Sequence, residues 1–264
     1  MFTADVRVQV PPRPPKATCF GKSLFYHLRK RGIMKHSNFN HCLVGLFLLV
    51  ELILYYLILT TSGMTLTVCC YGSIVICLLY ALVNVNRFDP WILFGLVFTA
   101  AADYFLVICS PIQQLQGMLF FLVTQTLYAI RLHRSCKYKW FLWLRSGLIL
   151  CAEAVTVAVL KDKLDSLAVV SICYYVNLIV NLIMSFAQFR ENKLFAIGMV
   201  LFLLCDTVIG LQVASGAYLS IPETSLLYRI IFMDFFLSWF FYLPSQVFIT
   251  LSGCKHGGVK KETA

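Results

Sequence analysis

Apolar residues fill most of this chain in runs long enough to cross a bilayer, and short polar stretches separate the runs. A transmembrane helix needs about 20 predominantly apolar residues. The runs lie at roughly 43–61, 64–86, 91–109, 112–132, 140–160, 165–189, 194–214 and 226–251. Only the connection at 215–225 is longer than a few residues. The pattern predicts one all-α domain, a polytopic membrane bundle of about eight transmembrane helices.

Composition supports a membrane protein and argues against a soluble one. Hydrophobic residues make up 60% of the chain and charged residues only 13%, which is too little polar surface for a soluble globule of 264 residues. Most of the 11 cysteines lie inside the apolar runs without CxxC or Cys/His spacing. We interpret them as small packing residues and expect no metal and no cofactor.

The first 41 residues differ from the rest of the chain. They carry eight Lys and Arg residues and the proline cluster PPRPP at 11–15, a composition typical of disorder. We predict a disordered basic leader at 1–41, a transmembrane domain at 42–252 and a short tail at 253–264. The abrupt change of composition also raises the hypothesis that Met34, rather than Met1, is the start residue, which N-terminal sequencing of the native protein would test.

The net charge of +10 comes from basic residues whose distribution along the chain indicates membrane orientation and not nucleic-acid binding. If the N-terminus is cytoplasmic, the inside segments hold 18 Lys and Arg residues and the outside segments only Lys161 and Lys163. This bias predicts that both chain ends are cytoplasmic. The short, simple loops suggest a bacterial cytoplasmic membrane.

Two acidic residues lie deep in the third and seventh runs. Asp103 and Asp206 each follow a glycine, Gly95 or Gly198, by eight residues, and each lies 12 residues beyond the start of its run. Ionisable side chains at such depth are costly and mark functional sites. Because the third and seventh spans run in the same direction, the acids lie at nearly the same depth. We predict two parallel four-helix repeats whose sites meet at Asp103 and Asp206.

Other spans carry polar residues that share one helix face. Polar side chains in membrane helices avoid lipid and face the bundle interior or a wet cavity. The alternative is interhelical hydrogen bonding worth about 0.6 kcal/mol on average, and for Asp234, Glu51 and Glu153 a structural carboxylate paired with a Tyr, an Asn or an Arg. The candidate substrate-binding residues are Gln125, Tyr128, Tyr175, Asn181, Asp234, Tyr242 and Gln246.

Two carboxyl groups in apolar surroundings suit acid–base catalysis. A low dielectric favours the protonated form of a carboxyl, and two that face each other do not easily both ionise. The pair would share one proton and so provide an acid and a base in one pocket. This arrangement suits hydrolysis by protonation of an electron-rich substrate and attack of an activated water. The chain has no GxSxG and no HExxH motif, and its five histidines lie outside the apolar runs.

The order of short motifs supports a family resemblance. The motifs are a Gly, an apolar run and Asp103 in span three, an aromatic-rich span four that ends in Tyr128, Tyr174 or Tyr175 with Met184 and Ala187 in span six, LFLLCD at 201–206, and Tyr242 with Gln246 in span eight. From about residue 43 to 251 the chain resembles the YhhN-type lysoplasmalogenases.

The resemblance implies a fold, a substrate and a catalytic pair. Members of that family are eight-span membrane proteins, and the characterised ones cleave the vinyl-ether bond of lysoplasmalogens to a fatty aldehyde and a glycerophospho-head group. Transferred by position, the two aspartates implicated in activity are Asp103 and Asp206. The expected partners are a lysoplasmalogen or another lysophospholipid and the bilayer, and hydrolysis of acyl-ester lysophospholipids stays open.

The chain departs from the family pattern at two places. Many members have a Gly-His pair about three residues before the span-four tyrosine, where this chain has Thr124 and Gln125. Many also carry a Lys near the start of span two, where this chain reads TVCCYGS. A glutamine can orient water or a lipid hydroxyl but cannot take a proton, and the missing Lys removes a phosphate contact.

The alternative function is transport of a small solute or proton. Intramembrane acids in internal repeats also mark proton relays. Against this reading, spans three and seven contain no Pro, so we expect continuous helices rather than the broken ones of transporters. A third reading is a scaffold in which the two acids are structural.

Overall fold

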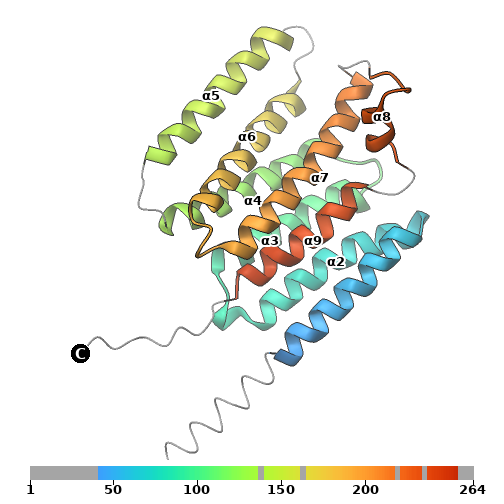
Figure 1. Cartoon of the computed structure of the whole chain (residues 1–264), viewed down its shortest axis with the longest axis vertical. Coiled ribbons are helices and arrows are strands. Elements are labelled where there is room, and N and C mark those ends of the chain that lie inside the picture. Colours follow the sequence, from blue (N-terminus) through green and yellow to red (C-terminus); the bar gives the residue numbers. More distant parts are fainter. Residues whose placement is uncertain (1–40, 136–139, 161–164, 218–220, 234–236, 255–264) are drawn as a thin grey trace, which may run out of the picture. The chain divides into compact units, whose positions relative to one another are not determined.

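The structure is a computed structural model of the chain, and it describes residues 41–135, 140–160, 165–217, 221–233 and 237–254 (Figure 1). Within these residues the regular elements are helices, and a single isolated bridge joins Phe88 to Cys254. The predicted all-α class is confirmed for this part of the chain. Residues 1–40 of the predicted leader, including Met34, and residues 255–264 of the tail lie outside it.

The helices follow the apolar runs closely. They are His41–Thr60, α2 (Gly63–Val83), α3 (Pro90–Asp103) with a π-helical segment at Tyr104–Ile108, α4 (Gln114–Ser135), α5 (Trp140–Leu160), α6 (Ser166–Ala187), α7 (Lys193–Ala217), α8 (Leu226–Ile231) and α9 (Leu237–Ser252). A 3-10 turn at Val85–Arg87 connects α2 to α3. Six of the described helices are long and apolar enough to cross a membrane, namely His41–Thr60, α2, α3 with its π-helical segment, α4, α6 and α7. The chain is thus a multi-pass membrane protein, while the count of eight spans and the side of each terminus stay predictions.

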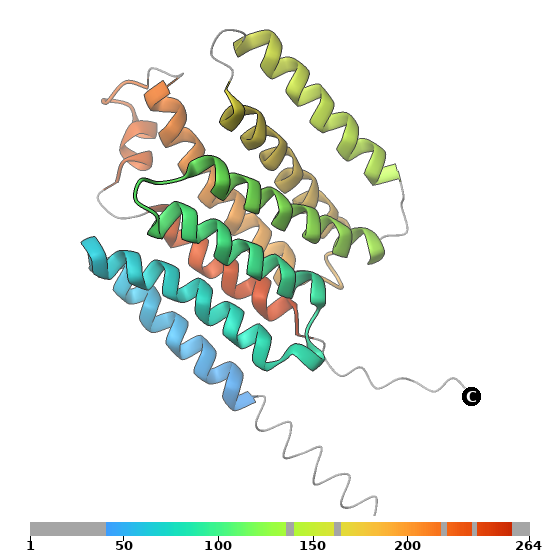
Figure 2. The same cartoon turned by 180° about the vertical axis from the view of Figure 1, so that it is seen from behind.

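The helices pack in the same way in two halves of the chain. The chain divides after Leu46, and the packing described here is that of Phe47–Ala264. In this unit α3 packs between α2 and α4, and α7 packs between α6 and α9 (Figures 1 and 2). The halves join where α4 packs on α6 and where α2 packs on α9. This correspondence of α2, α3 and α4 with α6, α7 and α9 supports the predicted parallel repeat.

Each glycine of the predicted repeat lies where two helices approach closely. A Cβ atom on Gly95 would lie 2.4 Å from Tyr128 Cε1, and one on Gly198 would lie 2.7 Å from Ile249 Cγ1 and 3.0 Å from the Ser245 carbonyl oxygen. Glycine permits this approach because it has no side chain. The matched spacing therefore places a close helix contact about two turns before each acid.

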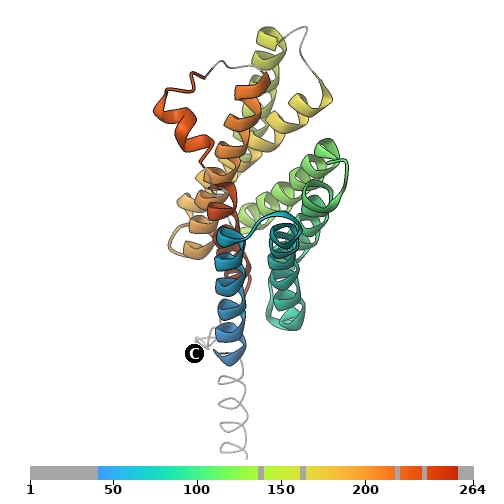
Figure 3. The ribbon, with the colours of Figure 1, turned by 90° about the vertical axis from the view of Figure 1, so that its right-hand side faces the viewer.

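The eighth apolar run forms two helices, and the prediction of one span at 226–251 was wrong. The Ser225 hydroxyl caps α8 by accepting a hydrogen bond from the Tyr228 N–H. At the other end, Gln212 Nε2 donates to the Ile231 carbonyl at 2.8 Å, which satisfies a carbonyl that a longer helix would have used. The short helix lies beside the C-terminal part of α7 (Figure 3).

Pro244 lies inside α9 and removes one backbone donor. A proline leaves the carbonyl four residues earlier without its helical partner. That carbonyl belongs to Phe240, and the Tyr55 hydroxyl donates to it at 3.3 Å. The helix that carries Tyr55 thereby contacts α9.

Glu51 attaches the same helix to α2. Its side chain is only 2% exposed, and its two oxygens accept hydrogen bonds from Ser73 Oγ at 2.7 Å and Cys77 Sγ at 3.5 Å. In the second half, Glu153 of α5 accepts from Cys173 Sγ at 3.0 Å. Both contacts agree with the interpretation of Glu51 and Glu153 as structural carboxylates, although their partners are hydroxyl and thiol groups.

One end of the bundle, which we call the Asp89 end, is held by polar contacts between distant segments. Arg131 of α4 forms an ion pair with Asp89 at 2.8 Å and donates to Asn192 Oδ1 at 3.1 Å. The Asp89 N–H donates to the Gly253 carbonyl at 2.8 Å. The N-termini of α3 and α7 and the C-termini of α4 and α9 therefore meet at this end.

Candidate active site

Asp103 is the last residue of α3, where the backbone passes into π-helical geometry. The Cys109 N–H donates to the Tyr104 carbonyl five residues earlier, at 3.0 Å. The third span is nevertheless one helix over Pro90–Ile108, in agreement with the expectation of a continuous span. Here the widened turn accompanies close packing of Leu106 on α4, where a Cβ on Gly117 would lie 2.5 Å from Leu106 Cγ. Single π turns inside helices occur frequently at functional sites.

Each of the two acids accepts a hydrogen bond from a tyrosine hydroxyl. Tyr242 of α9 donates to Asp103 Oδ2 at 2.6 Å, and Tyr174 of α6 donates to Asp206 Oδ2. Both tyrosines are buried, at 5% and 3% exposure. Buried hydroxyl and carboxyl groups are costly unless they are paired, so the two contacts fix one oxygen of each acid.

The two pairs belong to a single site. Asp103 and Asp206 lie close enough to interact electrostatically, and Tyr174 is within reach of the charge of both. Phe121 of α4 joins the tyrosines, with its ring centroid 6.0 Å from that of Tyr174 and 6.4 Å from that of Tyr242. Four helices, α3, α4, α6 and α9, therefore contribute to a site that α7 completes with Asp206.

Aromatic rings pack around the two tyrosines that bond to the acids. Phe202 of α7 lies 5.8 Å from Phe121 and 5.7 Å from Tyr242, and Trp239 lies 4.9 Å from Tyr242, all measured between ring centroids. These edge-on contacts make a stable apolar lining. The two carboxyl groups thus lie next to a buried cluster of packed aromatic rings.

Burial differs between the two acids. Asp103 is 3% exposed, whereas Asp206 is partly exposed.

The model of the YhhN family matches residues 73–253 of the chain. The chain belongs to the YhhN family. The resemblance inferred from the sequence is confirmed, and the matched region contains both acids and both tyrosines that bond to them. No curated protein and no solved structure matches the chain.

The other predicted site residues of the YhhN protein lie at various distances from the acids. Asn181 Nδ2 donates to Gln125 Oε1 at 2.9 Å, so these two residues contact each other. Tyr128 is fully buried, and its ring lies against Phe195 of α7 with 5.4 Å between centroids. Gln246 is also fully buried, one turn after Tyr242 on α9. Asp234 lies outside the described residues.

Sequence reasoning selected Tyr175 where the structure places Tyr174 on the acid. The Tyr175 hydroxyl instead pairs with Thr207 Oγ1 at 2.8 Å. The sequence did contain the relevant signal, because Tyr174, Asn177 and Asn181 follow the spacing i, i+3 and i+7 of a single helix face. Tyr175 falls on a neighbouring face.

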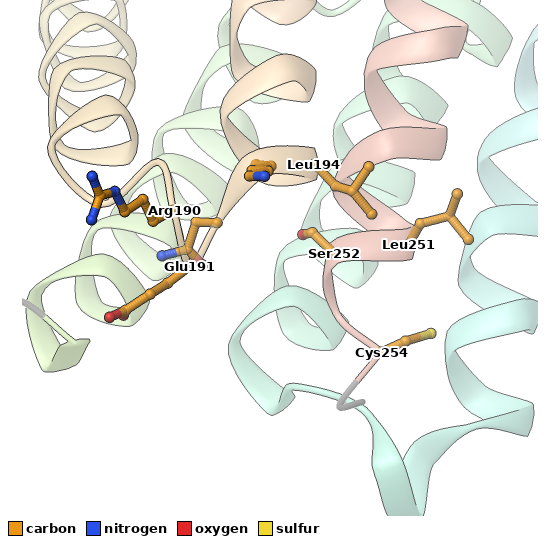
Figure 4. A pocket seen from close by; sticks show the side chains of 8 residues that line it. Arg190, Glu191, Leu194, Leu251, Ser252 and Cys254 are labelled. Carbon is orange, nitrogen blue, oxygen red and sulfur yellow. The ribbon is translucent and has the colours of Figure 1, made fainter. Parts of the chain in front are cut away.

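A separate pocket lies at the Asp89 end, between the α6–α7 connection and the last turn of α9 (Figure 4). Its lining residues are Arg190, Glu191, Asn192, Lys193, Leu194, Leu251, Ser252 and Cys254. Asp206 lies 13 residues along α7 from Lys193, about 20 Å at the rise of an α-helix. The pocket therefore does not belong to the acid site. Among the described residues, no three His, Cys, Asp or Glu side chains form a metal-binding group.

Proposed function

We propose that this YhhN protein is an intramembrane hydrolase that cleaves the vinyl-ether bond of lysoplasmalogens. The observation that carries the proposal is the pair of interacting acids, each bonded to a tyrosine hydroxyl, with aromatic rings packed around the tyrosines. Family membership supports the choice of substrate class, because the chain resembles the lysoplasmalogenases of that family. The same proposal names Asp103 and Asp206 as the catalytic pair.

The reaction requires an acid and a base at neighbouring positions. One carboxyl donates its proton to the outer carbon of the vinyl ether, and the electrons of the double bond shift to give an oxocarbenium ion. The other carboxylate stabilises this cation and accepts a proton from the water that adds to it. The resulting hemiacetal breaks its bond to the glycerol oxygen, giving an aldehyde and a glycerol hydroxyl. In this last step the second acid returns its proton to the glycerol oxygen and the first acid takes the proton of the hemiacetal hydroxyl, so the net reaction consumes one water and restores both acids.

The tyrosines and the aromatic rings have distinct roles in this scheme. Tyr174 and Tyr242 each hold Oδ2 of their acid, which leaves Oδ1 to face the substrate. Phe121 contacts both tyrosines, so its ring lies near any cation that forms between the acids, and aromatic faces attract cations. The apolar lining contacts the alkenyl chain.

A substrate panel tests the proposal. Detergent-purified protein is given three lysophospholipids that share a head group and chain length and differ only in a vinyl-ether, alkyl-ether or acyl-ester bond. We expect aldehyde from the vinyl ether and no product from the alkyl ether, because only the double bond can be protonated at carbon. Absence of aldehyde from folded protein would reject the proposal, and fatty-acid release from the ester would redirect it to ester hydrolysis.

The alternative is a proton-coupled transporter, and one observation favours it. Both acids lie inside candidate membrane spans, Asp103 in Pro90–Ile108 and Asp206 in Lys193–Val213, and intramembrane acids also mark proton relays. Proteoliposomes with an imposed pH gradient distinguish the two functions. A proton flux that Asp103→Asn abolishes, without aldehyde release, would select the transporter.

A further inference from the structure

Four buried amide side chains follow aromatic residues of the acid site by one or two helical turns, toward the Asp89 end. This amide layer consists of Gln125, Asn177, Asn181 and Gln246, with exposures of 0%, 3%, 0% and 0%. Buried amides are uncommon, and in a membrane protein an amide at the surface of the bundle would face lipid. The layer thus requires an explanation of its own.

The amide layer is next to the reacting groups. Gln125 follows Phe121, and Gln246 follows Tyr242, by four residues or one helical turn. The rings of Phe121 and Tyr242 contact each other at 6.4 Å. Asn177 follows Tyr174 by three residues. Helical side chains lean toward the N-terminus of their helix, and α4, α6 and α9 all run toward the Asp89 end, so the amides lean toward the acids.

Both halves of the repeat contribute an equivalent glutamine. In α4, Thr124 precedes Gln125, and the Thr124 hydroxyl donates to the Gly95 carbonyl at 3.3 Å. In α9, Ser245 precedes Gln246, and the Ser245 carbonyl lies 3.0 Å from the position of a Cβ on Gly198. The two glutamines therefore lie in matching positions of their respective halves.

The hydrogen bonds of the amide layer leave five polar atoms without a partner among the described residues. Asn181 Nδ2 donates to the side-chain and backbone oxygens of Gln125, at 2.9 Å and 2.7 Å, and Asn177 Nδ2 donates to the Cys173 carbonyl at 2.7 Å. The atoms without a partner among the described residues are Gln125 Nε2, Asn177 Oδ1, Asn181 Oδ1, Gln246 Nε2 and Gln246 Oε1. They include both donors and acceptors. Buried polar groups in folded proteins are almost always satisfied by protein or by ordered water.

We propose that the amide layer is a binding site for ordered water, and that this water is the nucleophile of the hydrolysis. Water both donates and accepts, as the five atoms require, and a buried water makes about three hydrogen bonds. The second part of the proposal rests on the proposed function. Hydrolysis needs one water per turnover at the acids, and a site one helical turn from Phe121 and Tyr242 supplies it.

Hydroxyl-radical labelling of the substrate-free protein tests the water site. Radiolysis generates radicals from bound water, and mass spectrometry then finds the oxidised side chains. We expect labelling of Phe121 and Tyr242, although they are only 6% and 5% exposed. Gln125→Met and Gln246→Met keep the side-chain length, remove the polar atoms, and should lower labelling about fivefold, because thioethers are weak hydrogen-bonding groups.

The control is Ser185→Ala. Ser185 is also fully buried, but its hydroxyl donates to the Leu182 carbonyl of its own helix at 2.7 Å. This variant should label like the wild type. Absence of label on both rings in the wild type, or equal label in wild type and methionine variants, would overturn the proposal. If a methionine variant does not fold, the test rests on the wild type and on Gln246→Glu. Gln246→Glu keeps a polar end on the side chain, so both proteins must show label on the two rings.

The test separates the water site from the proposed function. Labelling needs no turnover, so a labelled protein that releases no aldehyde keeps the water site and rejects the hydrolase. Aldehyde release by a protein whose rings are not labelled keeps the hydrolase and rejects the water site. In an active protein, the methionine variants should lower kcat about tenfold and leave KM nearly unchanged, since the lost group acts on water rather than on lipid binding.

Discussion

The two acids of the site are chemically similar but are held by different parts of the fold. Asp103 receives its hydroxyl from Tyr242 on α9, whereas Asp206 receives its hydroxyl from Tyr174 on α6. The position that matches Tyr242 in the first half is Phe121 of α4, whereas Tyr174 belongs to α6, the counterpart of α2. Each acid therefore has one tyrosine, but from non-equivalent positions of the repeat. This difference gives the pair two distinct environments, as an acid and a base require.

Tyr174→Phe and Tyr175→Phe form a matched pair of variants. Both remove one hydroxyl from neighbouring positions of α6, but only Tyr174 donates to an acid. We expect Tyr174→Phe to lower the rate of aldehyde release about 100-fold, in the range lost when a group that supports general acid–base catalysis is removed. Tyr175→Phe should change it less than about threefold, because its hydroxyl contacts Thr207. Equal losses in initial rate would show that the hydroxyl on Asp206 has no special role.

Sequence reasoning found the acids and Tyr242 but selected Tyr175 rather than Tyr174 as the second tyrosine, for a physical reason. The depth of a charge in an apolar run and a repeated spacing can be read along one dimension, so Asp103 and Asp206 were predicted as a pair. Which of two adjacent tyrosines faces an acid depends on the rotation of α6 against α7, which tertiary packing sets. The amides Gln125 and Asn181 were predicted as polar interior residues, and their mutual hydrogen bond needed the structure.

At the scale of elements, helix pairs hold the acids at fixed positions. The pair α3 and α4 meets at Gly95, and the pair α7 and α9 meets at Gly198. The apolar runs predicted these helices because hydrophobic length determines where a chain can span a bilayer. The runs gave no sign of the break after α8, because the group that satisfies its last carbonyl is Gln212 of α7. Apolar residues also continue through the π-helical turn, which the pattern cannot distinguish from an α turn.

Two alanine substitutions in α7 should have opposite effects on stability. At Gly198 a Cβ would lie 3.0 Å from the Ser245 carbonyl oxygen, whereas at Gly210 nothing lies within 4 Å. Gly198→Ala should lower the free energy of unfolding by about 1–3 kcal/mol through overpacking. Gly210→Ala should raise it by up to about 1 kcal/mol through helix propensity. Thermal unfolding in detergent measures both, and destabilisation of similar size at the two sites would contradict the packing described here.

At the scale of the whole molecule, the repeat explains why acids far apart in the sequence share one site. The two halves of the parallel repeat place α3 and α7 in equivalent positions, and the residues at matching depth meet where the halves join. The connections α2–α3 and α6–α7 then lie at the Asp89 end, which Arg131 holds together. The charge bias of the sequence predicts that this end is cytoplasmic.

Single cysteines test the predicted orientation. Arg87 and Glu191 belong to the Asp89 end, Ile112 lies between α3 and α4, and all three are exposed. In sealed cells that make the protein, a membrane-impermeant thiol reagent should label Ile112→Cys more than the unsubstituted protein, which has 11 cysteines of its own, and should label Arg87→Cys and Glu191→Cys no more than the unsubstituted protein. Disruption of the membrane should then expose the latter two. Labelling of the opposite set would reverse the orientation.

The central claim is that Asp103 and Asp206 act as one catalytic unit, and aldehyde release by four proteins tests it most directly. These are the wild type, Asp103→Asn, Asp206→Asn and the double variant, each checked for folding by thermal unfolding. We expect each single variant to lose activity at least about 1,000-fold. The double variant should be no less active than the less active of the two single variants, because residues that act as a unit are strongly non-additive. Turnover close to wild type in either single variant, or losses that multiply in the double variant, would contradict the claim.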